Sequence, residues 1–369
     1  MTKQRREQQQ REWHDVATGH SRRAFLKTGG AAGAVALAGC TGIQGGNGGN
    51  TDTTTGTSDS SSGSQSSMAD SLTIFHAGSL ETPFSAAQPK FEEKYDVTVN
   101  REAKGSVAST KKITKLGRKA DVLGVSDFRL IRNRVLSEYG DWYSIFTTNS
   151  MSIQYREDSK GADDISKDNW WEVLSRDGVT IGHSDPAVDP SGYRAVMTQQ
   201  LGKIPFQGSK LYDQSTYKKL RKNSTVPTGT ETNLEGQLKS GKLDYALYYQ
   251  SISSTSDMPY IDLQPQVDLS KATSKYAKHY SKAKVETDAG TFTGAPIAYG
   301  ITVPSVAEAS KLGSKWVEFM INGQGQEILK DKGLVPVDPA VVPASSKDAV
   351  PSNVLKHANA KSSLGPLKL

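Results

Sequence analysis

Two strand-like segments of the chain each end in a Gly-Ser pair that is followed by a helix-like segment. The first is LTIFHAGSL at residues 72–80, with Gly78 and Ser79 at the junction, and the second is VTVNREAKGSVAS at residues 97–109, with Gly105 and Ser106. The start of a helix presents backbone N–H groups that have no partner within the helix, and such groups bind anions. The two segments together therefore predict a site that holds one oxyanion without needing a positively charged side chain.

The same two serines also suit a structural role, because Ser is favoured as the N-cap of a helix. Capping explains Ser79 and Ser106 but not Gly78, which lets the backbone approach a ligand closely. Both interpretations stay open at this stage, and they are not exclusive.

The sequence carries no pattern typical of an enzyme. It has no GxSxG element, since GHSDP at residues 182–186 ends in proline, and no GxxxxGK[ST] phosphate loop. The six histidines show no metal-ligand spacing. Asp121 and Asp244 stand at the starts of predicted strands and are interpreted as structural. We therefore predict a binding protein that uses no cofactor.

The net charge of +6 is concentrated at the N-terminus, where residues 1–40 hold seven Lys and Arg against three Asp and Glu. The rest of the chain carries 38 basic against 36 acidic residues and no long basic run. Nothing in this distribution is typical of a nucleic-acid-binding surface.

The N-terminal segment has the features of an export signal. Ser21–Lys27 is SRRAFLK, which looks like a twin-arginine signal, and the apolar run that follows is too short to cross a bilayer. It ends in LAGC, which resembles a lipoprotein processing site, so Cys40, the only cysteine, is the expected lipid attachment point. In residues 41–70, 20 of 30 are Ser, Thr or Gly, which predicts a disordered tether spanning roughly 30 Å.

The remaining residues, 71–369, alternate short strand-like and helix-like runs, which is typical of an α/β architecture. The predicted strands are 72–75, 97–101, 121–125, 151–155, 179–182, 244–249 and 297–303. The predicted helices include 107–116, 190–201, 231–239 and 305–321.

Several motifs, in this order, resemble the archaeal-type molybdate/tungstate-binding proteins of ABC importers. They are IFHAGSL, AKGSVASTKKITKLGRKADVLGVSDF, DWYSIF, NWWEVL, DPAVDPSGYR, ETNLEGQLKSGKLDYALYYQS, TGAPIAYGITVP and VEFMINGQGQEILKDKG, between residues 72 and 340. The resemblance implies a type II periplasmic-binding-protein fold, in which two α/β lobes hold the ligand in a cleft. We expect one lobe at 71–152 plus 302–345, the other at 153–301, and a polar tail at 346–369.

The resemblance also implies roles for individual residues. Ser79, Ser106, the backbone of Ala187 and the Tyr249 hydroxyl would contact the oxygens of the anion, and Asp189 and Glu231 would coordinate its central molybdenum or tungsten. The residues alone also allow plainer interpretations: Asp189 before Pro190 suits a helix N-cap, Glu231 a first-turn acid, and Tyr249 a core tyrosine.

Two carboxylates beside an ordinary dianion would repel it by several kcal/mol, so they favour binding only when they coordinate the central atom. Molybdenum and tungsten can expand from four to six oxygen ligands, whereas the sulfur of sulfate does not. We therefore predict a receptor for molybdate or tungstate, anchored to the outer face of the membrane and serving the permease and ATPase of an ABC importer. The alternatives are a binder of another solute, such as a sulfate-like anion or a sugar held by Trp170 and Trp171, and a surface lipoprotein without a ligand.

Overall fold

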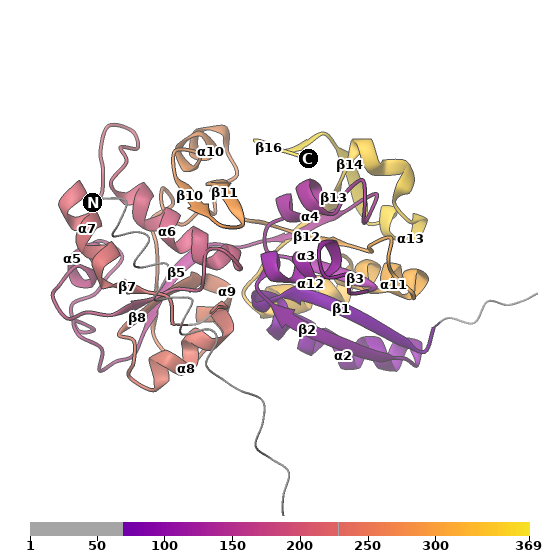
Figure 1. Cartoon of the computed structure of the whole chain (residues 1–369), viewed down its shortest axis with the longest axis horizontal. Coiled ribbons are helices and arrows are strands. Elements are labelled where there is room, and N and C mark those ends of the chain that lie inside the picture. Colours follow the sequence, from indigo (N-terminus) through magenta and orange to yellow (C-terminus); the bar gives the residue numbers. More distant parts are fainter. Residues whose placement is uncertain (1–68, 228) are drawn as a thin grey trace, which may run out of the picture. The chain divides into compact units, whose positions relative to one another are not determined.

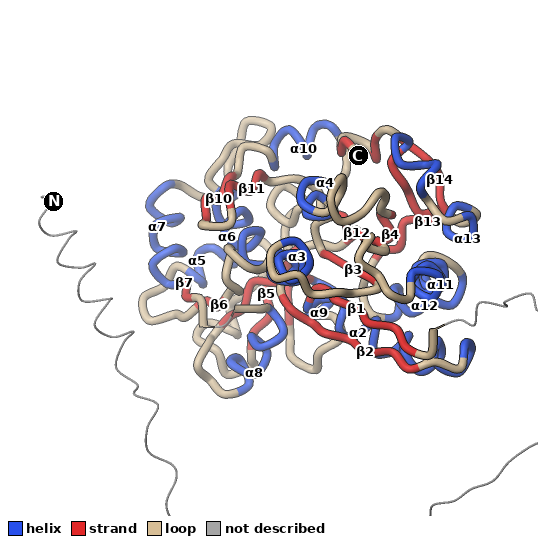
Figure 2. Tube along the Cα trace, turned by 45° about the vertical axis from the view of Figure 1, so that its right-hand side comes forward, coloured by secondary structure: helices blue, strands red, loops and turns tan. Residues whose placement is uncertain are grey.

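The computed structural model describes residues 69–227 and 229–369, which fall within one compact unit of the chain. The export signal, the lipid attachment at Cys40 and all of the tether up to residue 68 lie outside the described residues. Within the described ranges, no helix is both long enough and apolar enough to cross a membrane. Figures 1 and 2 show the described part as two α/β bodies, each built on its own sheet.

Lobe 1 is the body built on a seven-stranded sheet with the strand order β14-β13-β4-β12-β3-β1-β2. Strand β1 pairs in parallel with β2 and β3, whereas β12 runs antiparallel to both β3 and β4. The strands are β1 (Ser71–Ala77), β2 (Thr98–Lys104), β3 (Val122–Val125), β4 (Ser144–Thr148), β12 (Ala298–Thr302), β13 (Val335–Pro343) and β14 (Ala358–Lys361).

The helices of lobe 1 bury apolar faces against this sheet. They are α2 (Glu81–Tyr95), α3 (Ser106–Thr114), α4 (Arg129–Arg134), α11 (Ser310–Met320), α12 (Gly323–Asp331) and α13 (Ser352–Leu355). Phe84 and Phe91 of α2 meet Trp316 of α11 edge to face, with ring centroids 5.3 and 5.0 Å apart. Trp316 lies within the predicted helix 305–321 and is fully buried, so this face of α11 is part of the core.

Lobe 2 is the body built on a five-stranded sheet with the order β7-β6-β8-β5-β9. Its strands are β5 (Met151–Tyr155), β6 (Ile181–Gly182), β7 (Ser224–Thr225), β8 (Tyr245–Tyr249) and β9 (Tyr260–Asp262), with the separate hairpin β10 (Lys284–Thr287) and β11 (Gly290–Thr293). Its helices are α5 (Trp170–Leu174), α6 (Pro190–Gly202), α7 (Gln214–Asn223), α8 (Leu234–Lys239), α9 (Gln250–Ser253) and α10 (Ser274–Tyr280).

The chain crosses between the sheets twice. It leaves lobe 1 after β4 at Thr148, enters lobe 2 with β5 at Met151, and returns between β11 and β12. The expected lobe boundaries are therefore displaced, because 151–152 belong to the sheet of lobe 2 and 298–301 to the sheet of lobe 1. At each crossing the expected boundary falls inside a strand.

Residues 346–369, expected as a polar tail, contribute a strand and a helix to lobe 1. Strand β14 extends the sheet of lobe 1 by pairing in parallel with β13, and Val354 of α13 is fully buried. The composition of the tail is polar because an edge strand and a surface helix expose most of their side chains.

Candidate ligand-binding site

The first Gly-Ser pair lies where β1 ends and a short 3-10 helix, η1 (Gly78–Leu80), leads into α2. The Ser79 backbone N–H donates to Glu231 Oε1 of lobe 2 at 2.9 Å, and the Ser79 hydroxyl accepts from the Tyr299 hydroxyl at 2.9 Å. A Cβ on Gly78 would lie 3.1 Å from the Glu231 carboxyl carbon, so glycine allows lobe 2 to approach. The serine side chain caps neither η1 nor α2.

The second Gly-Ser pair begins α3, and Ser106 is completely buried. Its hydroxyl oxygen accepts the backbone N–H of Ser126 at 3.0 Å and is also 3.0 Å from the Ser126 hydroxyl. The interpretation of Ser106 as a helix cap is wrong, since its side chain makes no capping hydrogen bond. Both serines are thus buried polar groups at the starts of helices.

Helix α3 also meets lobe 2 through its backbone. The N–H groups of Val107 and Ala108 both donate to the Val188 carbonyl, at 3.1 and 3.3 Å. In Figures 1 and 2, α3 lies on the side of lobe 1 that faces lobe 2. Because Val188 immediately precedes Asp189, this contact fixes the backbone that carries the predicted carboxylate ligand.

Asp189 is the N-cap of α6, as its position before Pro190 predicts. Its Oδ1 accepts the N–H of Ser191 at 3.1 Å, and its Oδ2 accepts the N–H of Glu231 at 3.1 Å. The side chain is buried, with the residue only 1% exposed. A cap requires only one of these bonds, and the second ties the two predicted carboxylate ligands together.

Glu231 begins the 3-10 helix η2 (Glu231–Asn233) and is also 1% exposed. Its Oε1 accepts from Ser79, whereas its Oε2 is buried without a hydrogen-bond partner in the described part of the chain. Burial, and next to it the adjacent Asp189 carboxylate, raise the pKa of Glu231 well above its ordinary value. Neither carboxylate pairs with a lysine or arginine among residues 69–227 and 229–369.

The two remaining predicted ligand contacts, Tyr249 and Ala187, have different hydrogen-bond partners. Tyr249, the last residue of β8, is fully buried, and its hydroxyl donates to Ser126 Oγ at 3.2 Å while accepting from Arg194. This arrangement joins Tyr249 to Ser106 through Ser126. The N–H of Ala187 donates to its neighbour Asp185 Oδ1 at 2.8 Å, so in this structure it is engaged within its own turn.

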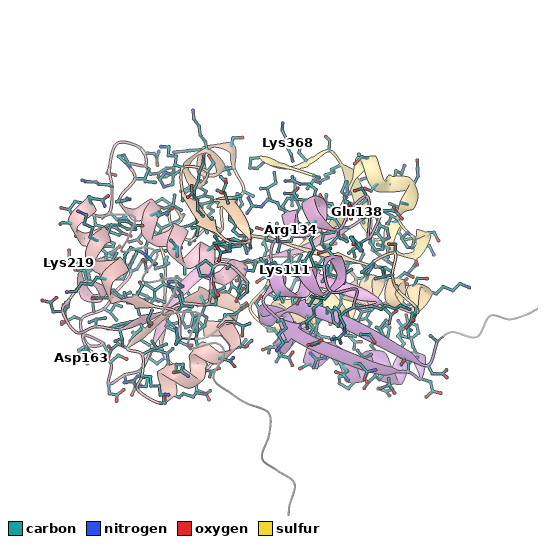
Figure 3. All side chains as sticks on the ribbon, viewed as in Figure 1. Lys111, Arg134, Glu138, Asp163, Lys219 and Lys368 are labelled. Atoms are coloured by element: carbon teal, nitrogen blue, oxygen red, sulfur yellow. The ribbon has the colours of Figure 1, made fainter. Side chains whose placement is uncertain are left out.

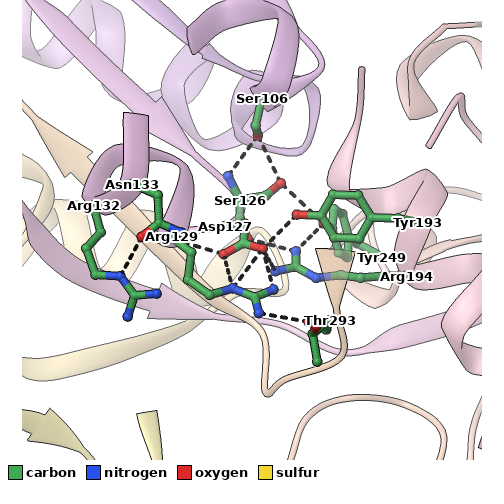
Figure 4. A network of polar contacts seen from close by, with 10 residues as sticks. All are labelled: Ser106, Ser126, Asp127, Arg129, Arg132, Asn133, Tyr193, Arg194, Tyr249 and Thr293. Carbon is green, nitrogen blue, oxygen red and sulfur yellow. Dashed lines mark hydrogen bonds and ion pairs between the residues drawn. The ribbon is translucent and has the colours of Figure 1, made fainter. Parts of the chain in front are cut away.

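A network of charged side chains across the lobes was missed by the sequence analysis (Figure 4). Asp127 of lobe 1 accepts from the Tyr193 hydroxyl at 2.6 Å and lies 3.5 Å from the Arg194 guanidinium, both on α6 of lobe 2. Arg129 bonds Asp127 at 2.6 Å and also the Thr293 carbonyl of lobe 2 at 2.8 Å. Burial alone would raise the pKa of Asp127, but Arg129 and Arg194 hold it well below its usual range. The signal was present in DPSGYR, of which only the aspartate was assigned a role.

The aromatic pair considered for a sugar site, Trp170 and Trp171, begins helix α5 of lobe 2. Trp170 is fully buried in the core of lobe 2, where it meets Tyr212 edge to face at 5.8 Å and donates its Nε1–H to Gln264. It is therefore a packing residue. The described residues also hold no group of three or more His, Cys, Asp or Glu arranged to bind a metal ion.

Charged surface residues of both signs occur on each lobe, as the labelled Lys111 and Glu138 on lobe 1 and Lys219 and Asp163 on lobe 2 illustrate (Figure 3). These pairs agree with the balanced charge of the sequence outside its N-terminus.

Comparison with known proteins places the chain in a family. Residues 72–335 match the model for bacterial extracellular solute-binding proteins. An uncharacterised solute-binding protein of Petrotoga mobilis is 38% identical, over 74% of this chain and 87% of the relative. The molybdate/tungstate-binding protein WtpA of Pyrococcus abyssi is 34% identical, over 70% of this chain and 83% of the relative.

Solved structures agree on the fold. The sulfate-binding protein SubI from Mycobacterium tuberculosis H37Rv matches with a TM-score of 0.54 at 16% identity, over 78% of this chain and 93% of that one. The periplasmic molybdate-binding protein of Azotobacter vinelandii matches with a TM-score of 0.52 at 13% identity, over 72% and 98%. The predicted periplasmic-binding-protein fold is confirmed, and the chain belongs to the family of bacterial extracellular solute-binding proteins.

Proposed function

We propose that this protein binds molybdate or tungstate between its lobes, with Asp189 and Glu231 coordinating the central metal of the anion. As a member of its family, the chain is the extracellular solute-binding component of an ABC importer and is not an enzyme. The proposal concerns the identity of the solute and the residues that hold it.

The observation that carries the proposal is the pair of buried, adjacent carboxylates. Asp189 and Glu231 are each 1% exposed, are joined by the bond from the Glu231 N–H, and have no basic side chain to neutralise them in the described residues. Burying two carboxylates without a cation is costly, and Glu231 Oε2 has no hydrogen-bond partner among the residues that the structure describes. A high-valent metal centre with room for two further oxygen ligands would satisfy this pair.

The groups of lobe 1 that face these carboxylates would supply the complementary contacts. The Ser79 N–H, which here bonds Glu231, and the Ser106 hydroxyl at the start of α3 are donors suited to the outer oxygens of the anion. An oxyanion such as sulfate would receive these bonds but would also face two carboxylates that its sulfur cannot coordinate, so repulsion excludes it. The name of the Pyrococcus abyssi relative, a molybdate/tungstate-binding protein, supports the same solute.

The proposed contacts come from both lobes, and this explains how the permease would detect a bound solute. Ser79 and Ser106 belong to lobe 1, whereas Asp189 and Glu231 belong to lobe 2. A solute touched by both lobes favours the closed form through contacts that the open form lacks. The permease would then distinguish loaded from empty receptor, with export through the twin-arginine segment and a lipid on Cys40 holding the receptor at the membrane.

The test is calorimetry with tungstate, molybdate and sulfate on the wild type, Asp189→Ala and the control Asp213→Ala. Asp213 caps α7 through the Thr216 N–H at 2.9 Å, so both variants lose a helix cap in lobe 2. We expect the wild type to bind tungstate and molybdate but not sulfate, Asp213→Ala to bind like the wild type, and Asp189→Ala to lose at least about a hundredfold in affinity.

Equal tungstate affinity in the two variants would remove Asp189 from the site. Sulfate binding as tight as tungstate binding would remove the carboxylate argument, and heat from sugars alone would favour the organic-solute alternative. A melting temperature for Asp189→Ala close to that of Asp213→Ala would exclude general unfolding as the cause of lost binding.

A further inference from the structure

Three hydroxyl groups form a line that begins at a buried arginine and ends at the proposed ligand contact Ser106. Arg194 donates to the Tyr249 oxygen, the Tyr249 hydroxyl is 3.2 Å from Ser126 Oγ, and Ser126 Oγ is 3.0 Å from Ser106 Oγ. We call Tyr249, Ser126 and Ser106, whose contacts Figure 4 shows, the hydroxyl relay. All three residues are fully buried. Ser126 directly follows β3 and has no role in the site as predicted from the sequence.

The direction of the relay follows from the number of donors and acceptors at each atom. A guanidinium only donates, so the Tyr249 oxygen accepts from Arg194 and its own hydrogen goes to Ser126. If Ser126 passes its hydrogen to Ser106, then Ser106 Oγ accepts twice, because it also takes the Ser126 N–H at 3.0 Å. A hydroxyl oxygen has two lone pairs and one hydrogen, so Ser106 is left with one hydrogen to donate.

Arg194 is fixed by both lobes. It is 2% exposed, its Nη1 donates to the Ser126 carbonyl at 2.8 Å, and its Nη2 lies 3.5 Å from Asp127, both in lobe 1. It stands on α6, the helix that Asp189 caps. One helix therefore places the carboxylate ligand at its start and, just over one turn later, the cation that begins the relay.

We propose that Arg194 and Ser126 are positioning residues of the solute site, which orient the hydroxyl relay so that Ser106 presents a hydrogen, and never a lone pair, to the bound oxyanion. This inference rests on the proposed function. It assigns Tyr249 an action on the anion through Ser126 and Ser106.

The test measures tungstate affinity by calorimetry for the wild type, Ser126→Ala, Tyr249→Phe and the double variant. Each single change interrupts one relay, so we expect each to lose about tenfold in affinity and the double variant to lose no more than about threefold beyond that. Ser109→Ala is the matched control: Ser109 is another buried serine on α3, which bonds the His76 carbonyl at 3.2 Å and lies outside the relay. It should bind tungstate like the wild type.

Non-additive losses of tungstate affinity place Tyr249 and Ser126 on one path to the anion, and melting temperatures of the two single variants that match that of Ser109→Ala separate this path from a merely structural coupling of two residues in contact. Losses that multiply to about a hundredfold in the double variant would overturn the relay and assign Tyr249 an independent contact. Tungstate affinity of Ser126→Ala equal to that of Ser109→Ala would also overturn it, while leaving the proposed function intact. A wild type that binds neither tungstate nor molybdate would overturn both together.

Discussion

Replacing Gly105 with alanine tests how closely the two lobes must approach. Gly105 has φ −54° and ψ 139°, a backbone conformation that alanine adopts without strain. A Cβ at this position would lie 2.3 Å from the Val188 carbonyl oxygen and 3.0 Å from the Asp189 Cβ. All the effect of the substitution therefore arises from contact between lobe 1 and the segment of lobe 2 that carries Asp189.

The magnitude follows from two consequences of that contact. Relieving it requires the segments to separate by about 1 Å, because nonbonded carbon and oxygen atoms approach no closer than about 3.2 Å. Such a shift weakens the bonds from Val107 and Ala108 to Val188, which contribute about 1 kcal/mol each, and a misplacement of 1 Å at a site typically costs about a hundredfold. We expect Gly105→Ala to lower tungstate affinity by about a hundredfold.

Calorimetry measures the affinity, and thermal unfolding of the ligand-free protein shows whether the variant stays folded. Gly236→Ala is the control, because Gly236 lies on α8 with no atom within 4 Å of the added Cβ. It should bind like the wild type and gain a few tenths of a kcal/mol in stability or more, since alanine favours a helix. Wild-type tungstate affinity in Gly105→Ala would refute the argument from close approach.

Three further changes probe the charges and the C-terminal segment. Glu231→Gln should weaken tungstate binding and make the stability of the ligand-free protein less sensitive to pH. Because the pKa of Glu231 is raised on folding, the contribution of its protonated form to the free energy of unfolding is complete below about pH 4.5 and is lost as the pH rises. Thermal unfolding of the wild type and the variant between pH 5 and 8 measures this difference. Asp127→Asn should lower the free energy of unfolding at pH 7 by about 3 kcal/mol, because the arginines beside it lose their carboxylate partner. The pKa of Asp127 is lowered on folding, so the difference in stability between wild type and variant, measured by urea unfolding, should become smaller below about pH 4. Deleting residues 358–369 should lower the melting temperature, because it removes β14 from the sheet of lobe 1; an unchanged melting curve would contradict that placement.

Local pattern was sufficient for much of the fold. Each of the seven predicted strands overlaps an observed one, and β5 (Met151–Tyr155) was predicted to the residue. The predicted helix 305–321 begins later, as α11 at Ser310. In the sheet of lobe 1, strands β4, β13 and β14 were missed, and in lobe 2 the short strands β7 and β9 and the hairpin of β10 and β11 were missed as well. Strand β13 includes three prolines and β14 is largely exposed, so neither has the alternating apolar pattern that marks a half-buried strand.

For the candidate site, the sequence by itself determined the local features: the Gly-Ser pairs at two helix starts and Asp189 as the cap of α6, a contact between residues two apart. Only the tertiary structure decided that Ser79 bonds Glu231, that Val188 meets the start of α3, and that Asp127 pairs with Tyr193 across 66 residues of chain. The physical reason is that a cap depends on the conformation of a single turn. Contacts between lobes depend instead on how two separately built sheets come together, which no local spacing encodes.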